Sequence, residues 1–168
     1  MSIATGPIVQ IAWVTDDIDA TERLLSEQYG VGEWMRIPDV HFGPEDCTYR
    51  GAPADFTAHI ALGYSGDLQL ELIQPVTGES IYTEFLAGNA PGLHHVCFTT
   101  EDIEAACAAA VAAGQEVVQR GSMMGGAMEF AYVAAPSAGA PYIEIARIGP
   151  DIQALFDAVK TNAAKATS

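Results

Sequence analysis

The sequence contains the same strand–helix junction twice, and this repeat limits the possible folds more than any other feature. The segment QIAWVTDDIDA at 10–20 aligns with HVCFTTEDIEA at 95–105, 85 residues further along the chain. Each copy begins with apolar and β-branched residues typical of a strand, and continues with threonine, acidic residues and isoleucine, which are typical of a helix start. The repeat indicates a duplicated unit, so we expect two modules of the same topology.

The first copy opens a series of elements that ends near residue 75. A strand over PIVQIAWV precedes a helix that Thr15 or Asp16 can cap and that Gly30 can end in the left-handed conformation. The other predicted elements of this half are a strand at 34–40, a loop rich in Gly, Pro and Asp at 41–55, and two strands at about 56–64 and 67–74.

The second copy is followed by the same order of elements. The strand GLHHVCFT leads into a capped helix that ends at Gly114, and three strands follow at 115–120, 128–134 and 140–147. We therefore predict an α+β fold in which two paired βαβββ modules form one cupped mixed sheet. The expected layout is a single domain over 1–168, with module one at about 7–75, a linker helix at about 80–90, module two at about 92–148 and a C-terminal helix at about 150–162.

Composition and charge restrict the classes of partner. Hydrophobic residues make up 49% of the chain, which is enough for the core of one domain. The 22 acidic and 7 basic residues give a formal charge of -15, which repels phosphate backbones and anionic lipids, so we expect neither a nucleic-acid nor a membrane partner. The start of the chain, MSIATGPIVQ, does not resemble a signal peptide, and we expect a cytoplasmic protein.

Four polar side chains occur at corresponding places in the two halves. Gln10 and His95 lie in the first strand of each module, and Glu71 and Glu144 lie in the last strands. Each has an ordinary interpretation alone, as a solvent-facing strand residue or, for His95, as a hydrogen-bonded core histidine. Alternation places all four on the sheet face opposite the apolar one, where a cupped sheet would bring them together. Imidazole and oxygen donors of this kind suit Zn²⁺, Ni²⁺, Co²⁺, Mn²⁺ or Fe²⁺.

At these residues the chain resembles the vicinal oxygen chelate superfamily, also called the glyoxalase/bleomycin-resistance/dioxygenase superfamily. The segments LELIQP, GLHHVCFTTEDIEAA and YIEIARI are most similar to methylmalonyl-CoA epimerase-like members. In that family the metal ligands come from the first and last strands of each module, which implies Gln10, Glu71, His95 and Glu144 here. Epimerase-like members usually have histidine at the position of Gln10, whereas glutamine there is typical of some glyoxalase I enzymes.

The resemblance implies a metal-dependent isomerase or epimerase. Such an enzyme abstracts a proton next to the carbonyl of an apolar or acyl-CoA-type substrate through an enolate, with Glu144 first and Glu71 second as candidate bases. The alternatives are a glyoxalase I-type lyase acting on a hemithioacetal and a non-enzymatic small-molecule binding protein, which need not retain the metal. We also expect a homodimer with a small-molecule carbonyl substrate as its partner.

Further side chains are candidates for the substrate pocket. His59 is either a cavity base or hydrogen bonder, or a structural residue, whereas His94 alternates away from the ligand face and is expected to be structural. Methionine adapts to irregular ligands, so methionines and aromatic residues could form an apolar wall, the alternative being ordinary core and turn. These candidates are Trp34, Phe42, Met123, Met124 and Phe130.

Overall fold

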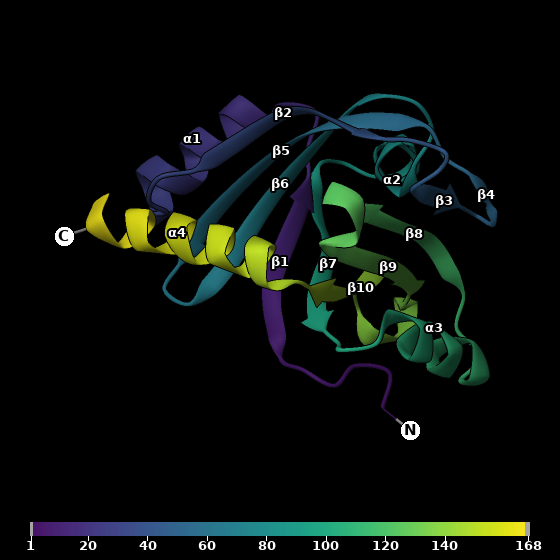
Figure 1. The fold of residues 1–168 in the computed structure, drawn as a ribbon. Coiled ribbons are helices and arrows are strands. Elements are labelled where there is room, and N and C mark those ends of the chain that lie inside the picture. The colour runs from purple at the N-terminus through teal and green to yellow at the C-terminus, as the bar shows by residue number, and fades with distance from the viewer. Residues whose placement is uncertain (1, 167–168) are drawn as a thin grey trace.

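The computed structural model describes residues 2–166 and contains one mixed sheet with four α-helices (Figure 1). The strands are β1 (Ile8–Val14), β2 (Met35–Phe42), β3 (Cys47–Tyr49), β4 (Ala52–Pro53), β5 (Phe56–Ser65), β6 (Leu68–Thr77), β7 (Gly92–Thr99), β8 (Val117–Met123), β9 (Met128–Ala134) and β10 (Tyr142–Ile148). The helices are α1 (Ile18–Tyr29), α2 (Ile81–Gly88), α3 (Ile103–Ala112) and α4 (Pro150–Ala166), with short 3-10 turns at Met124–Gly126 and Pro136–Ala138. The strand order is β2-β5-β6-β1-β7-β10-β9-β8-β3-β4.

The duplication is visible in the order of the strands. One half of the sheet runs β2-β5-β6-β1, and the other half repeats that order as β8-β9-β10-β7. Within the halves β1 pairs in parallel with β6 and β7 in parallel with β10, while β1 and β7 pair in the antiparallel sense at the centre. The predicted α+β fold with two βαβββ modules in a cupped mixed sheet is therefore confirmed.

The two helix starts are also duplicated. The side chains of Asp17 and Asp102 each accept a hydrogen bond of 2.9 Å from the backbone N–H three residues later, at the N-terminus of α1 and of α3. The preceding threonine hydroxyl, of Thr15 or Thr100, accepts from the N–H of the aspartate itself. Thus Asp17 is the cap, and the prediction of Thr15 or Asp16 was wrong, because the helix begins later and the threonine supports the turn that leads into it.

The sheet curls until its two ends approach each other. Segment 41–55, predicted as a loop, contains the end of β2 together with β3 and β4, and β3 pairs with β8 of the second module. Only four residues separate β2 from β3, and they span at most about 14 Å. Since β2 and β3 stand near opposite ends of the strand order, this short connection requires a cup. Phe42 closes it by contacting Phe130 of β9, with ring centroids 5.9 Å apart.

Both faces of the sheet are apolar. The largest hydrophobic cluster lies inside the cup and includes Phe42, Phe56, Ile73 and Phe130. On the outer face α1 packs on β5 and β6, and α3 packs on β9 and β10. The expectation that the polar side chains lie opposite the apolar face was therefore wrong, because the curl of the sheet buries its inner face as fully as the helices bury the outer one.

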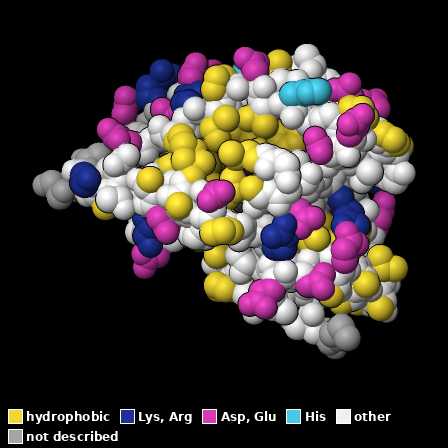
Figure 2. All heavy atoms as spheres, viewed as in Figure 1, with side chains coloured by type: hydrophobic (Ala, Val, Ile, Leu, Met, Phe, Trp, Pro, Cys, Tyr) yellow, Lys and Arg dark blue, Asp and Glu magenta, His cyan; other side chains and the backbone are white. Residues whose placement is uncertain are grey.

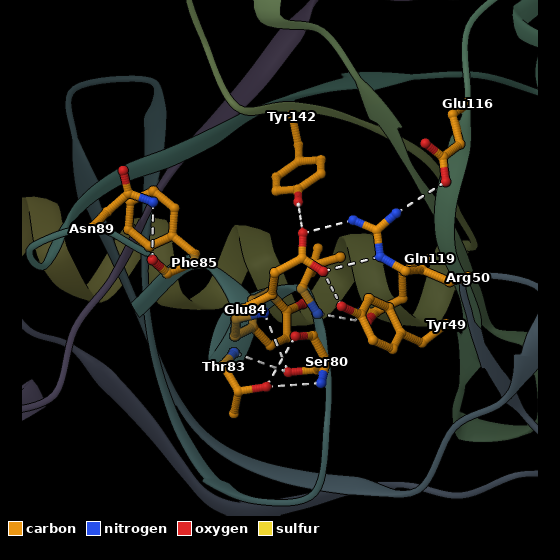
Figure 3. A network of polar contacts seen from close by, with 12 residues as sticks. Tyr49, Arg50, Ser80, Thr83, Glu84, Phe85, Asn89, Glu116, Gln119 and Tyr142 are labelled. Atoms are coloured by element: carbon orange, nitrogen blue, oxygen red, sulfur yellow. Dashed lines mark hydrogen bonds and ion pairs between the residues drawn. The ribbon is translucent and has the colours of Figure 1, made fainter. Parts of the chain in front are cut away.

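A polar network joins the linker helix to both modules (Figure 3). The Glu84 carboxylate on α2 accepts hydrogen bonds from Arg50 at 2.7 Å, from Tyr142 at 3.2 Å and from the Tyr49 hydroxyl. Arg50 also contacts Glu116 at 3.1 Å. The Arg50 guanidinium outweighs partial burial and, together with the tyrosine hydroxyls, lowers the pKa of Glu84 to about 2. One carboxylate thus connects the β3–β4 hairpin, α2 and β10.

Helix α4 lies across the open side of the cup (Figure 1). Its start is held by a hydrogen bond of 2.8 Å from Gly149 N–H to the Ala127 carbonyl, and further along Lys160 pairs with Asp67 of the β5–β6 turn at 2.6 Å. Over residues 2–166, no helix combines the length and the apolar character needed to cross a membrane.

We predict that Glu84→Gln destabilises the protein at pH 7 by about 1–2 kcal/mol, a value reduced for the partial exposure of the carboxylate. Because the folded-state pKa is depressed, this contribution is present above the ordinary pKa of 4.5 and is lost as the pH falls towards about 2. Chemical denaturation should show the difference from wild type narrowing over that range. Glu116→Gln, which removes only the outer contact of Arg50, should change the stability by less than about 0.5 kcal/mol.

Candidate functional site

Four neighbouring strands at the centre of the sheet present their polar side chains in two rows. Residues paired across the strands form the rows. One row consists of Glu71, Ala12, His95 and Tyr142, and the adjacent row consists of Gln69, Gln10, Cys97 and Glu144. Side chains paired across strands point to the same face, and residues two apart on one strand share it. Ala12 is small, so Glu71 and His95 on the flanking strands can approach each other.

Glu71, His95 and Glu144 form a buried cluster. His95 Nε2 lies 3.0 Å from Glu144 Oε2 and 3.6 Å from Glu71 Oε2, and one donor atom from each residue lies within 4.8 Å of the others. The His95 side chain is fully buried and that of Glu144 is 4% exposed. Neither contact has hydrogen-bond geometry, so within residues 2–166 the Nε2 atom of His95 has no hydrogen-bond partner.

Gln10 lines the same cleft as the two glutamates, and its amide is held in one orientation. Its Nε2 donates to Gln69 Oε1 at 2.7 Å, and Gln69 Nε2 donates in turn to the Tyr64 hydroxyl at 2.9 Å. The Oε1 atom of Gln10 is buried and has no hydrogen-bond partner in the described part of the chain. The chain Tyr64–Gln69–Gln10 therefore leaves an amide oxygen available to a ligand.

A β-bulge places two consecutive histidines side by side. In the β1–β7 pairing Ala12 is opposite His95 and Trp13 is opposite Leu93, so His94 is an extra residue. Such a bulge re-aims a side chain, and His94 Nδ1 lies 2.9 Å from His95 Nδ1. The expectation that His94 alternates away from the ligand face was therefore wrong, because strict alternation does not hold across a bulge.

The surroundings of these groups determine their protonation. Burial, reinforced by His95, lowers the pKa of His94 to about 2, so its Nδ1 is an acceptor for the N–H at His95 Nδ1. Burial opposes a positive charge on His95. The carboxylates of Glu144 and Glu71 outweigh this effect of burial and raise the pKa of His95 to about 9. Burial, opposed by the His95 contact, raises the pKa of Glu71. His94 thus accepts the proton on His95 Nδ1 and fixes the orientation of the ring, with Nε2 towards the carboxylates.

The arrangement fits a divalent cation. Gln10 Oε1, a buried oxygen without a hydrogen-bond partner among residues 2–166, belongs to the same site as His95 Nε2 and the carboxylates of Glu71 and Glu144. A buried acceptor oxygen without a partner is costly unless something binds it. One imidazole nitrogen, two carboxylates and an amide oxygen match the preferences of borderline divalent metals.

The site lies at the base of an apolar cleft, visible as a hollow surrounded by hydrophobic side chains above α4 (Figure 2). Four of the predicted pocket residues line it, namely Phe42, Met123, Met124 and Phe130. The other apolar lining residues are Ile37, Ile60, Leu62, Met128, Ile152, Leu155 and Phe156. The wall therefore comes from both modules and from α4.

Two predicted pocket residues lie elsewhere. Trp34 packs on the outer face with Ile18 and Leu72, and its Nε1 donates to Ser26 at 2.9 Å. His59 accepts a hydrogen bond of 3.1 Å from the backbone N–H of Asp39 at the rim of the sheet. For His59 the reason is alternation, since its neighbours Ile60 and Leu62 line the cleft. The prediction that Trp34 lines the cavity was wrong, and for His59 the alternative of a structural residue is the one that its contact matches.

Sequence reasoning overlooked several residues of the site. One is Tyr82, which lines the cleft and whose hydroxyl forms a hydrogen bond of 2.8 Å with that of Tyr132. Gln69 shares a strand face with Glu71, and this was the available signal, but its contact with Gln10 depends on the β1–β6 register. The roof formed by α4 has no sequence signal beyond an amphipathic C-terminal helix.

Residues 9–132 match the family model described as the Glyoxalase/Bleomycin resistance protein/Dioxygenase superfamily. The chain belongs to this superfamily. A comparison with curated proteins gave no match. The superfamily assignment agrees with the duplicated modules and with the position of the buried cluster between them.

Solved structures with the same fold have low sequence identity. Methylmalonyl-CoA epimerase from Mycobacterium tuberculosis is 19% identical with a TM-score of 0.61, over 92% of this chain and 95% of that chain. A hypothetical protein from Bacillus halodurans C-125 is 17% identical with a TM-score of 0.63, over 85% and 94%. A variant of Streptomyces coelicolor methylmalonyl-CoA epimerase, in complex with 2-nitronate-propionyl-CoA, is 20% identical with a TM-score of 0.59, over 86% and 96%. At this identity the similarity establishes the fold.

We predict that the metal-free protein, held in a chelator, loses about 2 kcal/mol of stability between pH 6.5 and about 9. The folded-state pKa of His95 is raised, so its contribution is fully present below 6.5 and is lost as the pH rises through about 9. Chemical denaturation should show this fall in wild type and not in His95→Gln. The control His41→Gln removes an exposed histidine paired with Asp55 and should retain the fall.

Proposed function

We propose that this protein is a metal-dependent isomerase or epimerase that transfers a proton at the carbon next to a carbonyl. The observation that carries the proposal is the pair of buried carboxylates, Glu71 and Glu144, on either side of His95 within an apolar cleft. Carboxylates in such surroundings can take a proton from carbon and return it. Structural neighbours that are methylmalonyl-CoA epimerases support this class of reaction.

Gln10, Glu71, His95 and Glu144 would hold the metal. When bound, a divalent ion there supplies a Lewis acid that polarises a substrate carbonyl and makes the adjacent C–H more acidic. His94 would keep His95 Nδ1 protonated, and Gln69 would keep the amide oxygen of Gln10 turned into the site.

Glu144 is the proposed base that takes the proton, and Glu71 is the second. Since they belong to different modules, a substrate carbon held between them is accessible from two sides. If Glu71 supplies a proton to the opposite side of the same carbon while Glu144 keeps the abstracted one, the result is epimerisation. Return of the abstracted proton to a different carbon gives isomerisation. The apolar walls exclude water, so a proton on either carboxylate stays close to the substrate.

A lyase acting on a hemithioacetal begins with the same proton abstraction, and the glutamine donor at Gln10 keeps this alternative open. The lining does not favour it, because among the described residues no lysine or arginine faces the cleft to bind the carboxylates of glutathione. Turnover of methylglyoxal with glutathione would support the lyase instead.

We expect the protein to catalyse exchange of the substrate proton next to a carbonyl for deuterium in D₂O. NMR measures this exchange for a panel of acyl-CoA esters and neutral ketones. Glu144→Gln should lower the rate by about a hundredfold or more, because it removes the base while keeping the shape of the side chain. A chelator should abolish exchange, and Glu27→Gln, an exposed change on α1, should leave it intact. Full activity in Glu144→Gln would contradict the assigned role.

We also predict that Gln69→Leu weakens binding of Zn²⁺ or Ni²⁺ by about tenfold or more, because Gln10 loses the acceptor that orients its amide. Gln69→Glu retains an acceptor for Gln10 Nε2 and should keep at least the wild-type affinity. Titration calorimetry with each metal measures both variants. Equal affinities in wild type and Gln69→Leu would show that Gln10 is not held by Gln69 for metal binding.

A further inference from the structure

We propose that the substrate of this cleft is an uncharged, largely apolar carbonyl compound that carries no coenzyme A or other polyanionic group. The carbonyl follows from the proposed function, whereas the apolar, uncharged character follows from the walls. The polar lining is confined to the base, where Gln10, Glu71, Glu144, Tyr82 and Tyr132 lie. The rest of the wall consists of aliphatic, methionine and phenylalanine side chains, which favour a hydrophobic body with one polar group at its buried end.

Charge around the cleft disfavours an anionic ligand. Within residues 2–166 the lining contains two carboxylates and no lysine or arginine. Five cationic side chains of the chain form ion pairs with carboxylates of their own: Arg36, Arg50, Arg120, Arg147 and Lys160. A diphosphate or carboxylate tail would have to compete with these carboxylates on a chain of net charge -15.

The adjoining pocket does not change this conclusion. It shares Gln10, Met128 and Phe156 with the cleft and contains Lys160. That ammonium lies 2.6 Å from Asp67, and Asp157 lines the same pocket. The two carboxylates exceed the single cation, so the pocket offers no net positive charge to a phosphate.

The mouth of the cleft is apolar as well. Met124 is 72% exposed and Leu155 on α4 is 38% exposed, and both line the cleft. Figure 2 shows hydrophobic side chains around the hollow. A bound molecule that extends past the metal donors therefore meets methionine and leucine at the rim, where a nucleotide arm would need cations and hydrogen-bond donors. Exposed apolar side chains beside a cavity are typical of a hydrophobic ligand site.

Calorimetry with two probes on the full chain, as purified and after addition of Zn²⁺, tests the inference. The first probe is 2-methyl-1-tetralone, an uncharged aromatic ketone with one stereocentre next to its carbonyl, and the second is methylmalonyl-CoA. We expect the ketone to bind with a Kd below about 100 µM and the CoA ester to show no saturable binding up to about 1 mM. Saturable binding of the CoA ester, or no binding of the ketone up to about 1 mM, would overturn the inference.

A matched pair of variants locates the binding. Leu155→Glu places a charge on the rim and should weaken ketone binding about tenfold, whereas Leu24→Glu, an exposed leucine on α1, should leave it within about twofold. Equal weakening by both changes, or by neither, would show that the ketone binds outside the cleft and would overturn the inference.

Deuterium exchange separates the substrate class from the proposed function. Ketone binding in the cleft without exchange would support the substrate class and contradict proton transfer. Exchange on methylmalonyl-CoA without binding of the ketone would support proton transfer and overturn the substrate class.

Discussion

The antiparallel pairing of β1 with β7 brings the two modules together, and every other feature of the site depends on it. Strand β1 contributes Gln10 and β7 contributes His95. The parallel neighbour of each strand, β6 or β10, contributes a glutamate. A register shift of one residue in this pairing would turn half of the donors towards α1 and α3. The small side chain of Ala12 and the bulge at His94 adjust the pairing locally, so that His95 Nε2 lies between Glu71 and Glu144.

Burial explains both the cost and the use of this cluster. A charged group away from water is stable only when it is paired, and removing one partner leaves the other exposed to the full desolvation penalty. Here His95 is paired with Glu144 and Glu71, but the Oε1 atom of Gln10 has no hydrogen-bond partner within the described residues. The protein tolerates this where the neighbouring strands are held from outside by α1 and α3 and where α4 covers the mouth. A cation or a substrate can then complete the interactions that folding leaves open.

The sequence alone supported the duplicated topology, because the repeat at 10–20 and 95–105 includes both strand alternation and the helix caps, which are local signals. It also placed Gln10, Glu71, His95 and Glu144 in corresponding strands, and the structure brings Glu71, His95 and Glu144 together with Gln10 lining the same cleft.

The sequence-based prediction failed for His94, because a bulge breaks the alternation on which the prediction relied. It failed for Trp34, which packs on the outer face of the sheet, and for His59, which is hydrogen-bonded to the Asp39 backbone at the rim. Segment 41–55 was unpredictable for a related reason, since its short strands form only where β8 provides a partner.

The sequence by itself therefore determined the modules and the strand positions of the candidate donors, which depend on residues close together in the chain. Only the tertiary structure decided which donors meet and what surrounds them. The Gln10–Gln69 contact, the His94–His95 contact and the roof formed by α4 join residues through strand register, a bulge and long-range packing. These are properties of the curled sheet as a whole, and no short segment encodes them, because each depends on a partner contributed by a distant part of the chain.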